Sequence, residues 1–212
     1  MANVKKITKN SGKISEHFSA SEFASHDGAT NLLFDYDLIP ILERLREYVE
    51  TPISNNSAYR TVARNKHEGG ASNSYHLYGR AIDIPFKTFY KNLTSLDLMC
   101  NFFNTLGLKG IIKYPTFVHI DTRTRKYHAT NKKVLINCGK VNIPYRALLK
   151  TGAKNIDVGI VQFKLNSLGY NCGNADMIFG AGTEKAVKNF QEANGLTVDG
   201  KVGPKTWTKL FK

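Results

Sequence analysis

The chain has little that would place it in a membrane or export it. Within its 212 residues no apolar stretch approaches the ~20 residues that a membrane-spanning helix needs. The first residues, MANVKKITKNSGK, are basic but are not followed by the apolar segment of a secretory signal peptide. We therefore expect a chain that is made in the cytoplasm without a signal peptide and that does not insert into membranes.

Cysteine is scarce, and its residues are Cys100, Cys138 and Cys172. Their number is odd and no two are spaced as C-x-x-C, so the sequence indicates neither a disulfide framework nor a cysteine-ligated zinc site. Free or buried thiols of a protein made in a reducing compartment are the simpler interpretation.

Acidic residues are few relative to basic ones. The sequence has 17 Asp and Glu and 30 Lys and Arg, which gives a net charge of +13. Such an excess favours a polyanionic partner, and nucleic acid, acidic lipid and an anionic bacterial cell wall all qualify. The basic residues are scattered, and no RNA-binding, helix-turn-helix or zinc-finger pattern accompanies them. We therefore do not expect a nucleic-acid-binding protein.

One short motif and a segment downstream of it carry the chemistry. Residues 74–83 read SYHLYGRAID, and residues 117–121 read FVHID. Together they offer two imidazoles and a carboxylate, from His76, His119 and Asp83, which is the ligand set of a catalytic zinc ion with its fourth position open to water. A buried structural histidine with a turn aspartate is the other interpretation, and the spacing does not choose between the two.

The spacing within the motif predicts its backbone. His76 and Asp83 are seven positions apart, which on one strand points their side chains to opposite faces and on one helix sets them about 10 Å apart. A bend is needed for both to reach one ion, and Gly79 is placed to make it. We expect a loop carrying His76, a strand over 80–85 and a neighbouring strand over 116–121.

The organisation of the chain changes near its last third. Residues 131–152 lack an amphipathic period and contain helix-breaking glycines and a proline, so they read as a closing strand plus a connector. We predict a first domain over 1–138, a linker over 139–152 and a second domain over 153–212.

The second domain reads as helical. Apolar residues recur at helical spacing over 158–168. A second helix is predicted from Thr183, as its N-cap, to Gly195, and a short third one begins near Pro204. These three segments predict a small all-α domain.

Part of this domain is repeated. Residues 176–183 and 199–206 both read D-x-x-[FV]-G-x-x-T, offset by 23 positions. The pattern predicts a loop that enters a helix, with Asp in the turn, Gly where the backbone needs a positive φ, and Thr near the helix start. The residues leave open whether the repeat binds a ligand or is only a recurring turn.

The segment FGAGTEKAVKNFQEANGLTVDGKVGPKTWTKL is the centre of a first resemblance. It is similar to the small three-helix peptidoglycan-binding domain found at the ends of cell-wall hydrolases, and shares its FQ pair and its DGxVGPxTW close. The resemblance implies a domain that anchors the chain to the glycan or the stem peptide of bacterial peptidoglycan.

The pattern S-x-H-x-x-G-x-A-x-D at 74–83 carries a second resemblance, to the zinc D-alanyl-D-alanine peptidases, the family of VanX-like dipeptidases and VanY-like carboxypeptidases. The FVH segment at 117–119 resembles the segment that gives this family its third ligand. SAYRT at 57–61 resembles its arginine-bearing segment, and ISEHFSASEF at 14–23 resembles the opening of its phage and bacterial members. The resemblance implies an α+β fold of the hedgehog/D,D-peptidase type, with a small antiparallel sheet and flanking helices.

The same resemblance implies roles for individual residues. His76, Asp83 and His119 would hold Zn²⁺. Arg60 would stabilise the oxyanion or pair with a substrate carboxylate, and Ser74 would hydrogen-bond the substrate backbone or its terminus. The residues alone equally allow a surface salt bridge for Arg60 and a capping hydroxyl for Ser74.

The chain departs from the dipeptidases at the general base. They carry a glutamate three residues before the last histidine ligand, where this chain has Thr116, which cannot accept a proton from water near neutral pH. Asp121 follows on the same side of the predicted strand as His119, and either replaces that glutamate as the catalytic base or orients a ligand histidine. Three other groups are less favoured: Tyr114, Glu68 and His67.

These features predict a monomeric zinc-dependent peptidase of the bacterial cell wall, of the phage endolysin type, that cuts stem-peptide or cross-bridge bonds next to D-amino acids. D,D-carboxypeptidase, endopeptidase and L-Ala–D-Glu peptidase activities all stay open. The resemblance also implies that the chain leaves the cytoplasm after a holin opens the membrane. The alternative, which Thr116 favours, is a non-catalytic wall-binding protein with a structural metal.

Overall fold

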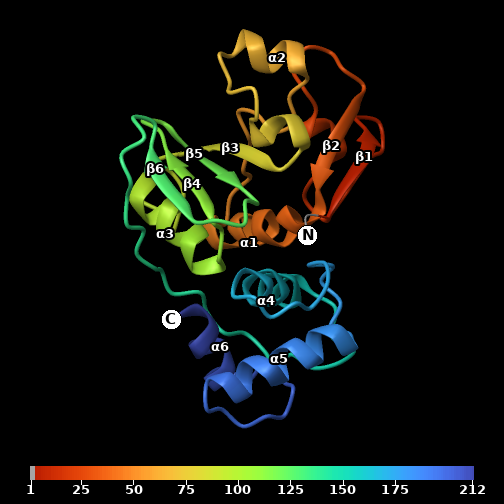
Figure 1. Ribbon diagram of the computed structural model, residues 1–212, viewed down its shortest axis with the longest axis vertical. Helices are drawn as coiled ribbons and strands as arrows, with labels where there is room; N and C mark the ends of the chain where they lie inside the picture. Colours follow the sequence, from red (N-terminus) through yellow and green to blue (C-terminus); the bar gives the residue numbers. More distant parts are fainter. Residues whose placement is uncertain (1–2) are drawn as a thin grey trace.

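Figure 1 shows the computed structural model, which describes residues 3–212 and so leaves out the first two residues of the predicted first domain. The strands form an antiparallel pair, β1 with β2, and a four-stranded sheet of order β3-β5-β4-β6. In the larger sheet β4 runs parallel to β6, and the other neighbours are antiparallel. The strands are β1 (Val4–Thr8), β2 (Asn31–Asp35), β3 (Ala81–Pro85), β4 (Gly110–Lys113), β5 (Phe117–Asp121) and β6 (Tyr127–Thr130).

Helices surround the sheets and make up the second part of the chain, so the predicted α+β class is confirmed. The α-helices are α1 (Ile39–Val49), α2 (Val62–His67), α3 (Leu96–Leu106), α4 (Ile156–Ser167), α5 (Ala181–Ala193) and α6 (Pro204–Phe211). The 3-10 helices are η1 (Ala20–Phe23), η2 (Tyr36–Leu38) and η3 (Tyr75–Tyr78). Among residues 3–212, none of the helices has the length and apolar character needed to cross a membrane.

The larger sheet is built around β5. This strand pairs with β3 along one edge and with β4 along the other, as its run of apolar and β-branched residues favours. The register sets Asp83 of β3 directly opposite His119 of β5. The strands expected over 80–85 and 116–121 therefore form, and they form as neighbours.

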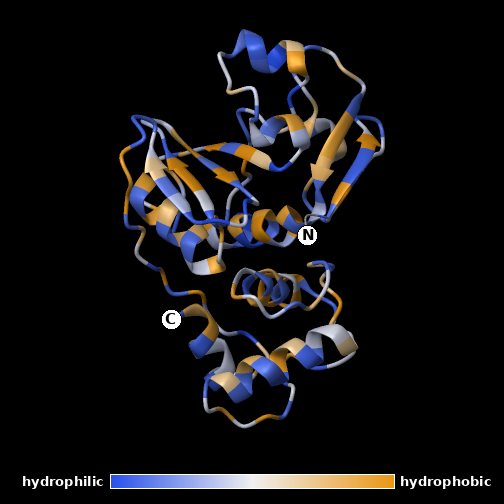
Figure 2. Ribbon diagram, in the orientation of Figure 1, coloured by the Kyte–Doolittle hydropathy of each residue, from blue (hydrophilic) through white to orange (hydrophobic). Residues whose placement is uncertain are grey.

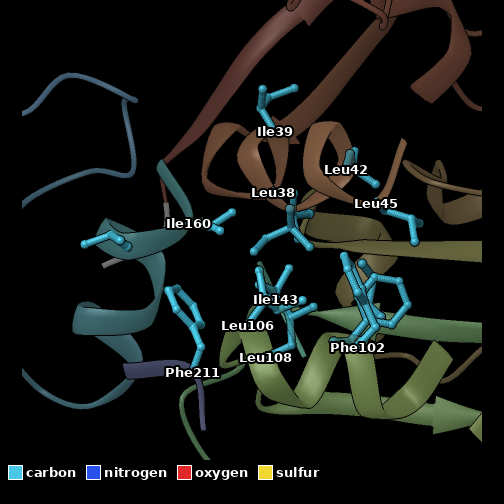
Figure 3. Packing of buried hydrophobic residues seen from close by; sticks show 14 of the residues in the cluster. Leu38, Ile39, Leu42, Leu45, Phe102, Leu106, Leu108, Ile143, Ile160 and Phe211 are labelled. Atoms are coloured by element: carbon cyan, nitrogen blue, oxygen red, sulfur yellow. The ribbon is translucent and has the colours of Figure 1, made fainter. Parts of the chain in front are cut away.

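One hydrophobic core runs through both parts of the chain. Helices α1 and α3 meet at Tyr48 and Phe102, whose ring centroids lie 4.9 Å apart, and Figure 3 shows that Ile160 of α4 and Phe211 of α6 join the same cluster. Figure 2 shows hydrophobic bands alternating with hydrophilic ones along α5, which is typical of a helix with one buried face. The second part of the chain is thus packed on the first. Its helix α4 lies between α1 on one side and α5 and α6 on the other (Figure 1).

Polar contacts cross the same boundary. The Arg44 guanidinium of α1, whose side chain is 1% exposed, forms a salt bridge of 3.1 Å with Asp157 of α4. The Lys164 ammonium donates a hydrogen bond of 2.7 Å to the carbonyl oxygen of Thr105 in α3. Burial lowers the pKa of Lys164 to about 8. Charged groups that are this deeply buried fix the position of α4, because moving the helix would leave them without partners.

The segment between the two parts has no strand. Over residues 131–152, all of which the structure describes, only isolated bridges form, among them Leu135 with Ala129. The predicted closing strand is wrong, because the sheet ends at β6 and a tight turn follows at once. The segment instead contacts α6, because the Trp207 indole donates a hydrogen bond of 2.8 Å to the Ile143 carbonyl oxygen.

Two buried glutamines explain the internal repeat. The amide nitrogen of Gln162, on α4, donates to the Asp176 carboxylate and to the Thr183 hydroxyl, both at 2.9 Å. In the second repeat the Gln191 amide, on α5, donates to the equivalent Asp and Thr at 2.8 and 3.2 Å. The Asp and Thr of each copy thus hold one glutamine of the preceding helix, which gives the repeat a structural role.

The entry into the helix differs from the prediction. Gly180, not Thr183, is the N-cap of α5, and its φ of −97° is not left-handed. The left-handed residue of the first repeat is Met177, at φ 64°, and that of the second is Gly200, at φ 70°. Met177 keeps this conformation while its N–H donates a hydrogen bond of 3.0 Å to the Gln162 side-chain oxygen.

Gly159 provides a test of the packing between α1 and α4. A Cβ added at Gly159 would lie 2.5 Å from the Cβ of Pro40. Glycine to alanine within a helix normally stabilises by about 1 kcal/mol. We expect Gly159→Ala instead to destabilise the chain by about 1–3 kcal/mol, the usual cost of overpacking a core, as measured by calorimetry. Gly180→Ala, at the N-cap of α5, is the control for an added methyl group that meets nothing, because its Cβ would have no atom within 4 Å. An unchanged or raised Tm for Gly159→Ala would contradict the close contact.

Candidate metal centre

Gly79 makes the bend that the motif requires. It ends η3 in the left-handed conformation, at φ 64°. A Cβ added there would lie 2.1 Å from the carbonyl oxygen of Leu33 in β2. Glycine is needed for both reasons, since a side chain would strain the backbone and collide with β2. The bend turns the chain from η3 into β3, so that His76 faces Asp83.

Three potential ligand atoms converge at one point. His76 Nε2 lies 3.1 Å from His119 Nδ1 and 3.2 Å from Asp83 Oδ1, and His119 Nδ1 lies 2.8 Å from the same oxygen. Within residues 3–212 this is the one group of three His, Cys, Asp or Glu side chains that could hold a metal ion by this spacing, and all three are buried. Ligands at ~2.05 Å from a tetrahedral zinc ion lie about 3.3 Å apart, close to the spacing found here.

Hydrogen bonds on the outer side of each imidazole set its tautomer. His76 Nδ1 lies 2.5 Å from the carbonyl oxygen of Ala58, so this nitrogen donates. His119 Nε2 lies 3.1 Å from a carboxylate oxygen of Asp121 and donates in the same way. The two inner nitrogens then direct lone pairs toward the Asp83 oxygen, an arrangement that requires a proton or a cation among them. The donor set and its supporting hydrogen bonds fit a zinc ion.

The cluster shifts the pKa values of its own members. Burial would lower the pKa of His119, but hydrogen bonds to Asp121 and Asp83 raise it to about 9. Burial would raise the pKa of Asp83, but hydrogen bonds from His119 and His76 hold it well below its usual range. A proton and a divalent cation therefore compete for the same buried position.

Asp121 lies behind His119, on the outer side of its ring. It is fully buried, and Arg123 donates to it from Nε at 2.8 Å and from Nη2 at 2.5 Å. Burial would raise the pKa of Asp121, but hydrogen bonds from His119 and Arg123 lower it to about 2. Asp121 is thus an anion engaged by two neighbours, which favours the second of its two predicted roles, that of orienting a ligand histidine.

The three candidate ligand residues border a cavity of about 680 Å³, which Arg60 and Ser74 also line. Arg60 donates from Nε to the Ser57 hydroxyl at 2.7 Å and from Nη2 to Asp83 Oδ2 at 2.6 Å. Its side chain is 14% exposed, so it is not in a surface salt bridge. Ser74 is the N-cap of η3, yet its hydroxyl makes no capping hydrogen bond.

Of the three less favoured candidates for the catalytic base, two line the cavity and one lies on the surface. Tyr114 and Glu68 line the cavity. The His67 side chain is 75% exposed. Thr116 does not line the cavity, and its carbonyl oxygen accepts a hydrogen bond of 2.9 Å from the Phe86 N–H. The position that holds the dipeptidases' glutamate therefore lies outside the lining of the cavity.

Sequence reasoning missed two basic residues that line the cavity, Arg123 and Lys133. Arg123 follows the FVHID segment by two positions, and this proximity is the only signal that the sequence offers for it. Lys133 lies in the region read as a strand and connector, where nothing in the pattern marks it.

Two protein-family models match the chain. Residues 7–121, more than half of its length, match the model described as peptidase M15. Residues 154–210 match a putative peptidoglycan-binding domain. The first match contains His76, Asp83 and His119.

Curated relatives and solved structures resemble part of the chain. The spore cortex-lytic enzyme of Bacillus cereus is 43% identical over 65 residues, which is 31% of this chain and 25% of that enzyme. Its counterpart in Bacillus subtilis is 40% identical over 77 residues, 36% of this chain and 25% of that enzyme. The chain thus spans about a quarter of the length of these relatives.

Among solved structures, a fused Zn-dependent amidase/peptidase/peptidoglycan-binding domain-containing protein from Clostridium acetobutylicum is 34% identical, with a TM-score of 0.29, over 31% of this chain and 29% of that one. The Burkholderia AP3 phage endolysin is 39% identical, also with a TM-score of 0.29, over 30% of this chain and 24% of that one.

Gly79 provides a test of how the centre is assembled. We expect Gly79→Ala to lower the free energy of unfolding by about 3 kcal/mol, because a left-handed backbone and a collision with β2 add together. Denaturant titration measures the change. Gly69→Ala is the matched control, since Gly69 has a φ of 65° but no atom within 4 Å of an added Cβ. Equal losses for the two variants would contradict the close approach of β2.

Proposed function

The chain belongs to the peptidase M15 family, and on this premise we propose that it is a zinc-dependent peptidase that hydrolyses the peptides of bacterial peptidoglycan. The observation that carries the proposal is the convergence of His76 Nε2, Asp83 Oδ1 and His119 Nδ1 beside a cavity, all within the matched residues 7–121. The peptidoglycan-binding domain at 154–210 supports the substrate class.

The three ligand residues would hold the zinc ion with two neutral imidazoles and one carboxylate. Such an ion supplies a Lewis acid, which polarises a peptide carbonyl and makes water easier to deprotonate. The outer hydrogen bonds of His76 to Ala58 and of His119 to Asp121 would keep both rings in the orientation needed to hold the ion.

Arg60 and Ser74 would bind the substrate. Arg60 is held by Ser57 and Asp83 and lines the cavity, so its guanidinium can face a carbonyl oxygen that gains negative charge or a substrate carboxylate. The Ser74 hydroxyl, which caps no helix, can donate to the substrate backbone or terminus.

Asp121 would act through His119. Its oxygens accept hydrogen bonds from His119 and Arg123 and it is fully buried, so we assign it to positioning the ligand ring rather than to taking a proton from water. Of the two roles that the sequence left open for Asp121, this is the orientation of a ligand histidine.

The biological role would be that of an endolysin that acts at the cell wall. The second domain would anchor the chain, and the net charge of +13 would favour the anionic wall. Stem-peptide or cross-bridge bonds next to D-amino acids are the proposed targets, cut by a monomer in carboxypeptidase, endopeptidase or L-Ala–D-Glu peptidase mode.

Metal removal tests the activity. We expect the purified chain to contain one zinc ion, measured by elemental analysis, and to lower the turbidity of purified cell walls while releasing new amino groups. A chelator abolishes both effects and added zinc restores them. His76→Ala and His119→Ala lose the zinc and the activity together, because two ligands do not retain the ion.

The control for these variants is His67→Ala, whose imidazole is 75% exposed and away from the cavity lining. It keeps zinc and activity. Wall binding without the release of amino groups would contradict the proposal and support the non-catalytic alternative.

Asp121→Asn separates the two roles of this residue. If Asp121 orients His119, zinc affinity falls about 10- to 100-fold and activity recovers at high zinc concentration. If it is the base, zinc content stays normal while kcat falls at every zinc concentration. We expect the first result, from competition with a zinc indicator and from rates at saturating zinc. Asp97→Asn is the control, because the Asp97 side chain is 71% exposed.

A further inference from the structure

A cavity of about 270 Å³ lies in the second part of the chain, between α4, α5, α6 and the segment that precedes them. None of its lining residues borders the cavity of the candidate metal centre. Among residues 3–212, no arginine and no acidic side chain lines it. Four lysines do, and we call it the lysine cavity: Lys140, Lys164, Lys209 and Lys212.

Acidic side chains do not neutralise the lysine cavity. Within residues 3–212 the lysines that form ion pairs with acidic side chains are Lys91, Lys113 and Lys188, so none of the four cavity lysines does. Lys140 donates a hydrogen bond to the carbonyl oxygen of Lys212. Because an ammonium has three N–H groups, this bond leaves two for a ligand.

Lys164 contributes a buried charge to the cavity. Its side chain belongs to a residue that is 6% exposed, and its bond to the Thr105 carbonyl oxygen is the one hydrogen bond that its ammonium makes within residues 3–212. Burial, together with the positive charges of Lys140 and Lys109, lowers the pKa of Lys164 to about 8. A buried cation among other cations is unfavourable unless an anion lies near it. The lysine cavity is therefore suited to an anionic ligand.

The kind of cation favours phosphate over carboxylate. An arginine guanidinium matches a carboxylate with two parallel hydrogen bonds, whereas a lysine ammonium acts as a point charge. The lysines reach the cavity from the segment before α4, from α4 itself and from the end of α6. Several separate point charges suit a group whose negative charge is spread over several oxygens, as in phosphate.

The apolar part of the wall favours a polyol or sugar beside the phosphate over a nucleic acid. Tyr170 and Phe190 pack edge to face, with ring centroids 5.5 Å apart, and Phe190 is 3% exposed. At most one aromatic ring of the lining is thus open to a ligand. Single-stranded nucleic acid binds on successive exposed rings, on which its bases stack.

The position of the cavity in the chain indicates where such a ligand would be found. Apart from Lys140 and Lys212, the lining residues lie within residues 154–210, which match the putative peptidoglycan-binding domain. A phosphate-bearing polymer attached to the cell wall is then the anion that this domain would meet.

We propose that the lysine cavity binds a phosphate group of an anionic polyol-phosphate polymer in the bacterial cell wall. The cavity is a second point of attachment, separate from any contact with peptidoglycan itself. Because it shares no residue with the lining of the candidate metal centre, the inference does not rest on the proposed peptidase activity.

The test is calorimetric titration of the full chain with three polyanions of equal total charge, at about 0.15 M salt. These are poly(glycerol phosphate), polyglutamate and a single-stranded oligodeoxynucleotide. We expect poly(glycerol phosphate) to bind about tenfold more tightly than either of the others, as for one additional charged hydrogen bond. Glycerol 3-phosphate should compete with the polymer.

Lys140→Gln and Lys209→Gln each remove one exposed charge from the cavity wall. Each should weaken the binding of poly(glycerol phosphate) about fivefold, and the double variant more. Lys205→Gln is the matched control, because Lys205 is exposed on the same helix as Lys209 and does not line the cavity. It should keep the original Kd. The test uses exposed lysines because loss of the bond from Lys164 to Thr105 would also weaken the packing of α4.

Equal losses in Lys205→Gln and Lys209→Gln would show an effect of net charge alone and overturn the site. An unchanged Kd in the double variant would do the same, as would polyglutamate that binds as tightly as poly(glycerol phosphate). Tighter binding of the oligonucleotide through Lys140 and Lys209 would overturn the wall polymer as the occupant. If the chain cleaves cell walls but binds no polyol phosphate, the peptidase assignment stands and this site does not.

Discussion

Three lone pairs directed at one buried point are the constraint on which the rest of this structure depends. His76, Asp83 and His119 bring two nitrogens and an oxygen within 3.2 Å of one another in the protein interior. Such a group is unfavourable unless a positive charge lies among its members. The left-handed Gly79, the register of β3 against β5 and the outer hydrogen bonds of both imidazoles all serve to maintain it.

The sequence could predict this centre because its information is local. The bend at Gly79 and the two strands follow from spacing and composition over short stretches, and antiparallel pairing then sets Asp83 opposite His119. The outer contacts could not be predicted, because they join distant segments. Which of its two roles Asp121 takes depends on Arg123 and on the direction of the His119 ring, and neither is visible in a pattern of residue types.

The second part of the chain shows the same limit. Helical spacing predicts the positions of α4, α5 and α6 to within about two residues. It does not predict which residue of the repeat takes the left-handed conformation. The left-handed position falls on Met177, which a rule based on glycine does not find, and the reason for the Asp and Thr of the repeat is Gln162, in the helix before it. Composition predicted the bounds of a second domain, but it could not predict that Arg44 and Asp157 join α4 to α1 within one core.

That shared core has a consequence for how a wall-cutting chain would explore its substrate. Two domains joined by a flexible tether sweep a volume that grows with the length of the tether. Here α4 is fixed on α1, so the span between a point of attachment and a point of cleavage is a constant of the folded molecule. A chain that both bound and cut the wall would therefore reach bonds at one set distance from its point of attachment, and it would have to detach before it could reach others.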